Sequence, residues 1–181
     1  MSPDAFVIPL KRFDLAKERL RVSGVASVAE LAQELATRVI ASCAPRHTIV
    51  LSESDEISDF ADALGCEVVR SDARDLNEAV QRAYGALQER FDRLVIVHGD
   101  LRHPEGLGSF DPGEGITIIT DHHGRGTNVM ALPTGLDFNF YYGANSAPLH
   151  RREAERLGCQ VEVVTDSPWR FDVDEPDDLD R

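Results

Sequence analysis

The sequence predicts a single α/β domain in which helices cover both faces of a mostly parallel, mixed sheet, a three-layer αβα arrangement. Short apolar runs alternate with amphipathic helical stretches over the first hundred residues, and this alternation is typical of a parallel sheet. The 181 residues are enough for one complete core and too few for two. No linker or internal repeat divides the chain, so residues 1–181 are expected to form one domain.

The first half of the chain is expected to contain four strands separated by three helices. Apolar residues at helical spacing predict the helices, and short apolar runs predict the strands. The expected strands are 5–10, 47–52, 66–70 and 93–98, and the expected helices are 27–43, 54–65 and 75–91. Ser27 with Glu30, and Asp75 with Glu78, have the spacing of capping boxes at two of the helix starts.

The second half is less regular. Residues 101–115 contain four glycines and two prolines, which predict a loop with one helical turn. Ser146 is expected to be the N-cap of a helix that ends just before Gly158. The expected strands are 116–120, 127–132, 138–143, 159–165 and 170–174, and the expected helices are 146–158 and a last one that begins at 175.

Composition argues against several classes of function. The net charge of −13 disfavours DNA, RNA or an anionic membrane as a bulk partner. No apolar run approaches the roughly 18 residues of a membrane span. The apolar run near the N-terminus precedes the basic residues, which is the wrong order for a signal peptide. Three cysteines without paired spacing indicate a reducing, cytoplasmic location and no zinc ribbon.

Charged residues are expected to gather at the carboxyl ends of the strands. Residues 11–21 follow the first strand and contain five cations and two anions. Asp100 follows the strand 93–98, and residues 172–180 contain six anions and no cation. Because ligands of α/β sheets bind at this edge, the three features together predict a site for a nucleotide with Mg²⁺.

Each of these features also has a simpler explanation when it is taken alone. Asp100 fits a turn residue, residues 11–21 fit one exposed face of a helix, and residues 172–180 fit a solvated terminus. Only their joint occurrence at strand ends favours the functional interpretation.

The histidines around Asp100 suggest a second kind of site, a transition-metal centre. His98 and Asp100 share one face of an extended strand, but His103 lies beyond the turn. Zinc also needs a fourth ligand, and the adjacent pair His122 and His123 is a distant source for it. Satisfied or exposed histidines are therefore the expectation, and the histidines receive no role.

Two glycine-containing loops predict a second region that binds anions. Gly124 and Gly126 precede the hydroxyl of Thr127, and Gly143 precedes Ser146 at a helix start, where free N–H groups favour negative charge. An ordinary hairpin turn and plain helix capping explain the same residues. Together, the loops fit a second substrate that carries a phosphate.

With these motifs, the sequence resembles the phosphoenolpyruvate / 2-phospho-L-lactate guanylyltransferase family (the CofC and FbiD proteins of coenzyme F-420 biosynthesis). The resemblance implies a GT-A-like nucleotidyltransferase fold and the transfer of GMP from GTP to the phosphate of phosphoenolpyruvate or 2-phospho-L-lactate, with release of pyrophosphate. It covers nearly the whole chain and rests on IPLKRFDLAKERL (8–20), LNEAV (76–80), VIVHGDL (95–101), DHHGRGTNVM (121–130), YYGANSAPLH (141–150) and FDVDEPDDL (171–179).

The resemblance also implies roles for individual residues. The metal-binding carboxylates, expected to hold Mg²⁺, match Asp100, Asp172 and Asp174. The site of the phosphorylated acceptor matches Thr127, Gly143 and Ser146. The segment around the triphosphate of GTP contains Lys11, Arg12, Lys17 and Arg19, of which Arg12 and Lys17 are expected to act in catalysis with Asp100. Asn77 matches a position near the nucleoside, where a side-chain amide could read a base edge.

Departures from the family pattern leave the acceptor open. Arg102 stands where relatives have proline, close to where a second anionic substrate is expected, and residues 102–115 are shorter and richer in glycine. Phosphoenolpyruvate, 2-phospho-L-lactate and 3-phosphoglycerate all remain candidates. The alternatives are a molybdopterin guanylyl- or cytidylyltransferase, a GT-A glycosyltransferase, and a nucleotide-binding regulator without catalysis.

Overall fold

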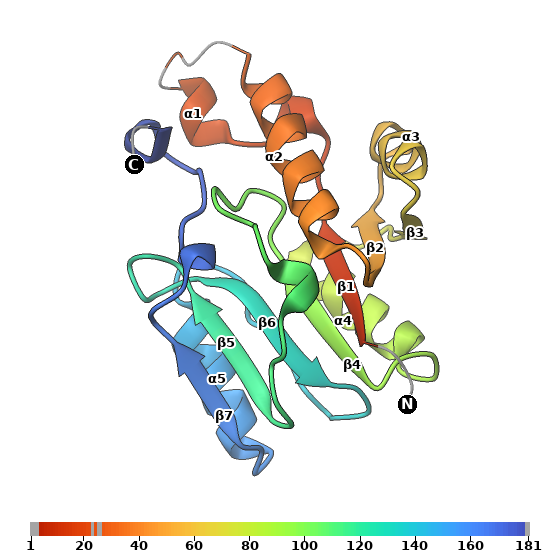
Figure 1. The fold of residues 1–181 in the computed structure, drawn as a ribbon, viewed down its shortest axis with the longest axis vertical. Helices are drawn as coiled ribbons and strands as arrows, with labels where there is room; N and C mark the ends of the chain where they lie inside the picture. Colours follow the sequence, from red (N-terminus) through yellow and green to blue (C-terminus); the bar gives the residue numbers. More distant parts are fainter. Residues whose placement is uncertain (1–3, 23, 25–26, 180–181) are drawn as a thin grey trace.

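A seven-stranded sheet lies at the centre of the computed structural model, with helices on both of its faces (Figure 1). The structure describes residues 4–22, 24 and 27–179, without the side chains of residues 18, 19 and 179. The strands are β1 (Asp4–Pro9), β2 (His47–Ser52), β3 (Glu67–Arg70), β4 (Arg93–Val97), β5 (Ile116–Thr120), β6 (Thr127–Pro133) and β7 (Val161–Val164). The α-helices are α1 (Glu18–Val22), α2 (Val28–Cys43), α3 (Asp55–Ala63), α4 (Leu76–Leu87) and α5 (Ser146–Arg156).

The strand order β3-β2-β1-β4-β6-β5-β7 confirms the mixed, mostly parallel sheet. Strands β3, β2, β1 and β4 are parallel, β6 is antiparallel to both β4 and β5, and β7 is parallel to β5. The chain winds outward from β1 to β3 and then returns to the other side of β1 with β4. A crevice is therefore expected above the carboxyl ends of β1 and β4, where the winding direction changes.

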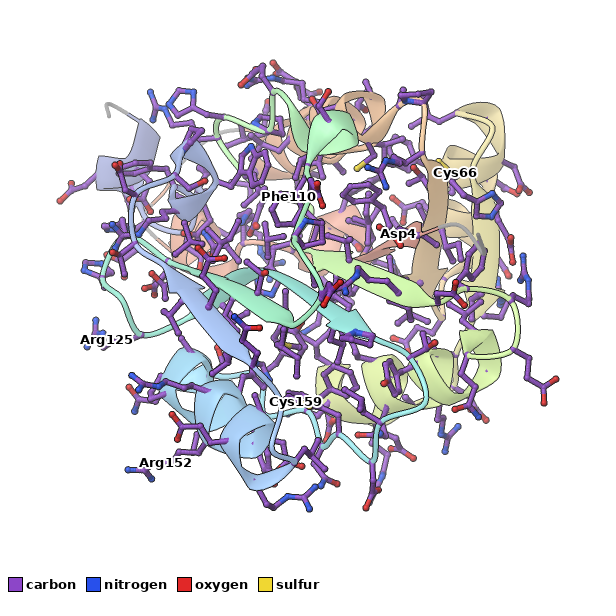
Figure 2. All side chains as sticks on the ribbon, turned by 60° about the horizontal axis from the view of Figure 1, so that its bottom comes forward. Asp4, Cys66, Phe110, Arg125, Arg152 and Cys159 are labelled. Atoms are coloured by element: carbon purple, nitrogen blue, oxygen red, sulfur yellow. The ribbon has the colours of Figure 1, made fainter. Side chains whose placement is uncertain are left out.

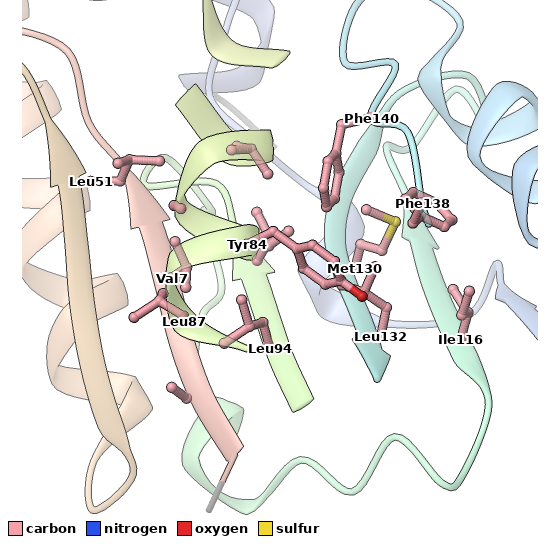
Figure 3. Packing of buried hydrophobic residues seen from close by; sticks show 14 of the residues in the cluster. Val7, Leu51, Tyr84, Leu87, Leu94, Ile116, Met130, Leu132, Phe138 and Phe140 are labelled. Carbon is pink, nitrogen blue, oxygen red and sulfur yellow. The ribbon is translucent and has the colours of Figure 1, made fainter. Parts of the chain in front are cut away.

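Alternate residues of the strands face two separate hydrophobic cores. On one face, Val7 and Leu94 pack with Tyr84 of α4, and α5 covers the same face (Figure 3). On the other face, Phe6 and Val95 pack against α2 and α3. Each fully buried side chain of this size stabilises the fold by about 1.5–3 kcal/mol. No helix in the described part of the chain combines the length and apolar content that a membrane crossing needs.

The cysteines are free thiols that lie in different parts of the fold. Cys43 and Cys66 are buried, while Cys159 is partly exposed just before β7 (Figure 2). Burial raises the pKa of the Cys43 thiol to about 12, so this residue behaves as a small apolar side chain.

Of the three predicted helix caps, one is confirmed and two are wrong. Asp75 caps α4, because its carboxylate accepts a hydrogen bond from the backbone N–H of Glu78 at 2.9 Å. The Ser27 prediction is wrong: Ser27 has φ 57° and makes no side-chain bond at the start of α2. The N-cap of α5 is Asn145, and Ser146 is the first helical residue, so that prediction is wrong by one position.

The strand predicted at 138–143 does not form in the described chain. Phe138 and Phe140 are buried in the core, which explains the alternating pattern of the sequence. Four successive backbone N–H groups of this segment donate to side chains of α5 and α4 in turn, so none is left for a neighbouring strand. These bonds are Asn139 N to Glu153 Oε1 (2.9 Å), Phe140 N to Gln81 Oε1 (3.4 Å), Tyr141 N to His150 Nε2 (2.9 Å) and Tyr142 N to Asn77 Oδ1 (2.5 Å).

The prediction of a strand at 170–174 is also wrong. These residues form a segment that crosses the edge of the sheet, called the crossing segment below. After β7 the chain forms a 3-10 turn, η3 (Pro168–Arg170), and crosses the strand ends to reach Asp100. It makes a single bridge, between Leu101 and Asp172, because it runs over the sheet edge instead of alongside a strand. The helix expected from 175 is a short 3-10 turn, η4 (Pro176–Leu179). Another such turn, η2 (Leu107–Ser109), is the helical turn expected within the loop 101–115.

Candidate active site

Three aspartates from distant parts of the chain meet at the carboxyl end of β4. One oxygen each of Asp100, Asp172 and Asp174 lies within 4.8 Å of the others. The backbone N–H of Val173 donates to the carbonyl of Asp100 at 3.1 Å, which holds the C-terminal segment in place. The Val173 side chain is buried against α1 and α2, so the aspartates on either side of it point the opposite way.

Lys17 supplies the positive charge of this cluster. Its ammonium group donates to a carboxylate oxygen of Asp100 and to Asp174 Oδ1, the latter at 3.2 Å, and its side chain is only 5% exposed. The backbone at Lys17 has φ 56°, a strained conformation for a residue other than glycine. Burial lowers the pKa of Lys17, but the charges of Asp100 and Asp174 outweigh it and keep the ammonium protonated.

One ammonium does not balance three carboxylates. Burial raises the pKa of Asp172 to about 7, and the charges of Asp100 and Asp174 add to this shift. Asp100 Oδ1 is buried and has no hydrogen-bond partner in the described chain. Carboxylate oxygens are the donors that hard divalent cations prefer, and a charge of +2 removes the repulsion. The residues present therefore fit a cation such as Mg²⁺.

A cleft of about 690 Å³ opens beside the aspartates. It lies over the carboxyl ends of β1 to β4, as the topology requires, and its volume is in the range of small-molecule sites. Its ionisable lining residues are Lys11, Lys17, Glu53, Arg74, Asp75, His98, Asp100 and Asp174.

Of the four cations predicted to surround a triphosphate, the structure places Lys11 and Lys17 in the cleft lining. Arg12 does not line it: the guanidinium is half exposed and makes two hydrogen bonds to Asp14, at 3.0 and 2.6 Å. The Arg19 side chain lies outside the described residues. Arg74, which the sequence motifs did not single out, is a third cation of the cleft lining.

Asn77 does not face the cleft, so the structure does not show the expected base-reading position. Its Nδ2 donates to the carbonyl of Tyr142 at 3.0 Å, and its Oδ1 accepts from the backbone N–H of Tyr142 at 2.5 Å. Both ends of the amide are therefore engaged by one peptide segment. In this structure Asn77 holds the residues that lead into Gly143.

Of the residues predicted to bind the acceptor, Thr127 and Ser146 form a second, buried cluster, the hydroxyl cluster, and the exposed Gly143 adjoins it. Ser146 Oγ donates to Thr127 Oγ1 at 3.1 Å, and the backbone N–H of Ser146 donates to the carbonyl of Gly143 at 3.2 Å. Gly143 has φ 148°, which a side chain would disfavour. A residue that the sequence reasoning missed, His150, contacts Thr127 Oγ1 through Nδ1 at 3.1 Å. Its spacing of four from Ser146, on one helix face, is the signal that could have revealed it.

Two contacts connect the hydroxyl cluster with the aspartates. The ring of Tyr142 lies between those of His98 and His150, with centroid distances of 5.6 and 4.9 Å. Asn128, next to Thr127 on β6, donates to Asp172 Oδ1 at 3.3 Å. This proximity arises because β6 is antiparallel to β4, so that its first residues lie at the carboxyl end of β4.

Arg170 attaches the loop before Thr127 to the C-terminal segment. Its guanidinium donates to the carbonyl of Asp121 at 3.0 Å and to that of His122 at 2.9 Å. The loop's own cation, Arg125, is exposed and projects away from the body of the molecule (Figure 2). No pattern in the sequence around Arg170 predicts that it holds this loop.

The histidine metal site is not formed. Among the described residues, the three aspartates are the one group of three or more potential ligands. His98 is buried beside Tyr142, and His103 borders a small pocket of about 170 Å³ with Arg102 and Phe171. The Arg102 guanidinium donates to the carbonyl of Asp178, so it faces the C-terminal segment and does not line the cleft as a second-substrate residue would.

Comparison with known sequences finds one family model and several relatives that match most of the chain. A family model described as "Guanylyl transferase CofC like" matches residues 5–181. A phosphoenolpyruvate guanylyltransferase of Mycolicibacterium gilvum is 32% identical, over 98% of this chain and 89% of the relative. One from Chloroflexus aurantiacus is 28% identical, over 97% and 92%. A 3-phospho-D-glycerate guanylyltransferase of Phenylobacterium zucineum is 26% identical, over 75% and 66%.

Solved structures share the fold at low sequence identity. A putative nucleotide-diphospho-sugar transferase from Desulfovibrio desulfuricans superposes with a TM-score of 0.71, at 16% identity over 91% of this chain and 80% of the other. A nucleotidyl transferase from Methanothermobacter thermautotroptrophicus gives a TM-score of 0.68, at 18% identity over 99% and 95%. These matches confirm the predicted nucleotidyltransferase-like fold.

Proposed function

The chain belongs to the CofC-like guanylyl transferase family and is a nucleotidyltransferase, and from this we propose that it transfers GMP from GTP to the phosphate of phosphoenolpyruvate. Pyrophosphate is the leaving group. Relatives named phosphoenolpyruvate guanylyltransferase match 96–98% of this chain, which supports phosphoenolpyruvate as the acceptor. We further propose that the reaction serves coenzyme F-420 biosynthesis.

One observation carries the proposal: three aspartates and a buried lysine stand at the edge of a nucleotide-sized cleft. Phosphoryl-type transfer requires little covalent chemistry from the protein and depends on positioning and charge stabilisation. A cluster of carboxylates beside cations supplies both. The site has two parts, the aspartates at the cleft edge and the connected hydroxyl pair of Thr127 and Ser146. Two such parts fit two anionic substrates.

Mg²⁺ is the cofactor that we propose for this site, with Asp100, Asp172 and Asp174 as its ligands. When bound, it neutralises charge on the phosphates of the nucleotide and on the leaving pyrophosphate. Lys17 stays protonated beside these carboxylates and offsets part of the remaining negative charge. Lys11, an exposed residue of the same cleft lining, adds a second cation.

The acceptor needs no general base from the protein. A phosphate monoester has a second pKa of about 6, so at pH 7 it is already an anionic nucleophile. The task of the protein is to hold the acceptor oxygen in line with the α-phosphorus of GTP, and positioning accounts for much of the rate. We assign this orientation to Thr127, Gly143 and Ser146. None of the described histidines is needed as a proton acceptor.

A second acceptor, 3-phospho-D-glycerate, has a specific observation in its favour. Relatives named for that acid also match this chain, although over about three quarters of it. Both acids and 2-phospho-L-lactate present a phosphate and a carboxylate close together. We therefore expect phosphoenolpyruvate to be the preferred acceptor, and the other two acids are assayed beside it.

The test is pyrophosphate release, with Mg²⁺ present or chelated, across GTP, ATP and CTP and the three acids, with the products identified by mass. We expect release with GTP and phosphoenolpyruvate and a product that contains GMP. We expect Asp100→Asn to lower turnover by a factor of about 10³ or more, because one ligand charge is lost, with an unchanged circular dichroism spectrum.

Asp177→Asn is the matched control, since Asp177 is an exposed carboxylate of the same C-terminal segment that lies outside the cluster. It should keep wild-type turnover. Absence of pyrophosphate with every combination would reject the transferase proposal, and near-normal activity of Asp100→Asn would reject the metal assignment.

A further inference from the structure

His150 is a fully buried ionisable residue that the reaction described above does not use. It is 0% exposed. Its two ring nitrogens contact the hydroxyl of Thr127 on β6 and the backbone N–H of Tyr141 in the segment 138–142. Thr127 and Ser146, the two hydroxyls next to it, are each 1% exposed. The direction of every hydrogen bond in this cluster therefore matters, because it decides which group is left to meet a ligand.

The backbone determines which nitrogen of His150 carries hydrogen. The N–H of Tyr141 can only donate, and it points at Nε2 of His150 at 2.9 Å, so Nε2 must present its lone pair. Burial, with a contribution from His98, lowers the pKa of His150 to about 4, so the ring is neutral near pH 7. A neutral imidazole has one N–H, and here it must be on Nδ1, which faces Thr127 Oγ1 at 3.1 Å.

Counting hydrogens then gives the polarity of the hydroxyl pair. His150 Nδ1–H donates to Thr127, and one hydroxyl hydrogen lies between Ser146 and Thr127. The pair has two hydroxyl hydrogens, so one remains to be donated. No acceptor for it is within hydrogen-bond distance among the described residues. With the opposite tautomer, Thr127 would donate to Nδ1, both hydrogens would be used, and the pair could offer only lone pairs.

We propose that His150 is a positioning residue that makes the Thr127–Ser146 pair a hydrogen donor to an ionised oxygen of the acceptor, a carboxylate or a phosphate. The inference rests on the proposed function, because Thr127 and Ser146 bind the acceptor there. A donor that meets an anionic oxygen makes a charge-assisted bond, which is the stronger kind. The opposite tautomer would direct lone pairs at the same anion and repel it.

The tautomer is measured directly, without activity. In a long-range ¹H–¹⁵N correlation spectrum of the ¹⁵N-labelled protein at pH 7, we expect the His150 ring to show a protonated Nδ1 and an unprotonated Nε2. Its signals are assigned by their loss in His150→Asn. The internal reference is His47, whose half-exposed ring uses Nε2 against Glu67 at 2.7 Å. A protonated Nε2 at His150 overturns the inference.

Two variants of His150 test its donor atom, Nδ1, and its acceptor atom, Nε2, one at a time. His150→Asn keeps an N–H donor near the position of Nδ1 and loses the acceptor for Tyr141, whereas His150→Gln keeps an acceptor near Nε2 and loses the donor. We expect the KM for the acceptor to rise about tenfold or more in His150→Gln and to stay within about threefold in His150→Asn, as loss of a bond to a charged group predicts. The KM for GTP should change in neither.

A purely structural role predicts the reverse order, with His150→Asn the weaker enzyme and its melting temperature falling in parallel. His47→Gln, at the far end of β2, is the control and should leave both KM values unchanged. An active wild type with unchanged acceptor KM in His150→Gln overturns this inference alone. A wild type that is inactive with every acceptor overturns the proposed function and this inference together, whichever tautomer is observed.

Discussion

Asn77 and Gln81 lie one turn apart on α4 and use their amides in the same way. Each donates to and accepts from the backbone of the segment 138–142, through Tyr142 for Asn77 and through Phe138 and Phe140 for Gln81. An amide can do this because it has a donor and an acceptor side by side, as a peptide group does. Asn77 is the one next to the cleft residues Asp75 and Leu76, so its two bonds connect the cleft lining with the segment that leads into Gly143.

This arrangement predicts the behaviour of Asn77→Ala. The free energy of unfolding should fall by about 1–3 kcal/mol, because two partly buried backbone groups lose their partners. The ratio of kcat/KM for GTP to that for ATP should stay at the wild-type value. Urea unfolding and steady-state kinetics with both nucleotides provide the measurement.

Gln81→Ala, with the same bonds one turn further from the cleft, is the matched control for Asn77→Ala. Both variants should lose similar stability and keep the same nucleotide preference. A tenfold fall in the GTP preference of Asn77→Ala alone would restore the base-reading role that the resemblance implied.

At the scale of elements, α5 stabilises the segment 138–142 through one buried carboxylate. Glu153 is 5% exposed and accepts from the backbone and side-chain nitrogens of Asn139 at 2.9 and 2.6 Å. It also pairs with Arg156 on its own helix at 2.8 Å. Hydrogen bonds from Arg156 and Asn139 lower the pKa of Glu153 from 4.5 to about 2. An extended segment without strand neighbours is held in place by such bonds.

Glu153→Gln should therefore destabilise the protein in a pH-dependent way. At pH 7 we expect a loss of about 1.5–3 kcal/mol, the range for hydrogen bonds to a charged group. A carboxyl whose pKa is lowered on folding stabilises the fold above its unfolded pKa, and this contribution disappears as the pH falls through the folded pKa. The difference between wild type and variant should thus be largest above about pH 4.5 and shrink toward pH 2.

Urea unfolding at pH 7, 4 and 3 measures this difference. Glu155→Gln removes the exposed pair with Arg151 on the same helix and should cost no more than about 0.5 kcal/mol. A Glu153→Gln difference that is the same at all three pH values would show that the pKa of Glu153 is not lowered.

At the scale of the whole molecule, the topology concentrates negative charge at one point of an already acidic chain. The parallel strand β4 delivers Asp100 to the sheet edge, and the crossing segment delivers Asp172 and Asp174 to the same place. Each carboxylate raises the electrostatic cost of the others. We therefore expect folding to be coupled to the binding of a cation at this cluster.

Mg²⁺ should consequently stabilise the chelator-treated protein. The expected gain in the free energy of unfolding is about 2.7 kcal/mol at a concentration of 100 times Kd. Asp172→Asn, which keeps the acceptor oxygen for Asn128, should be more stable than wild type without Mg²⁺ and should gain less from it. Thermal unfolding with MgCl₂, and with NaCl at equal ionic strength, distinguishes site binding from screening. Equal effects of both salts, or a full gain in Asp172→Asn, would contradict the prediction.

Much of the fold and part of the site were predictable from local pattern. The seven strands of the sheet, the helices α2 to α5 and the cap at Asp75 follow from residues that are close in sequence. The prediction at 138–143 failed because its alternating Phe138 and Phe140 are buried, and burial does not require a strand partner. The prediction at 170–174 failed because this segment crosses the sheet edge and makes a single bridge there. Lys17 and Asp100 both line the cleft, because they follow β1 and β4, neighbouring parallel strands whose carboxyl ends lie at the same edge of the sheet.

The amino-acid sequence was enough to predict a mostly parallel sheet, its ligand-binding edge and the kinds of charge that gather there, since apolar periodicity and the alternation of strands with helices are local properties of the chain. Tertiary structure alone decided that Asn77 holds Tyr142 and that His150 contacts Thr127. The physical reason is that a polar side chain satisfies its hydrogen bonds with whatever group packing brings within about 3 Å. That neighbour is set by where distant segments cross.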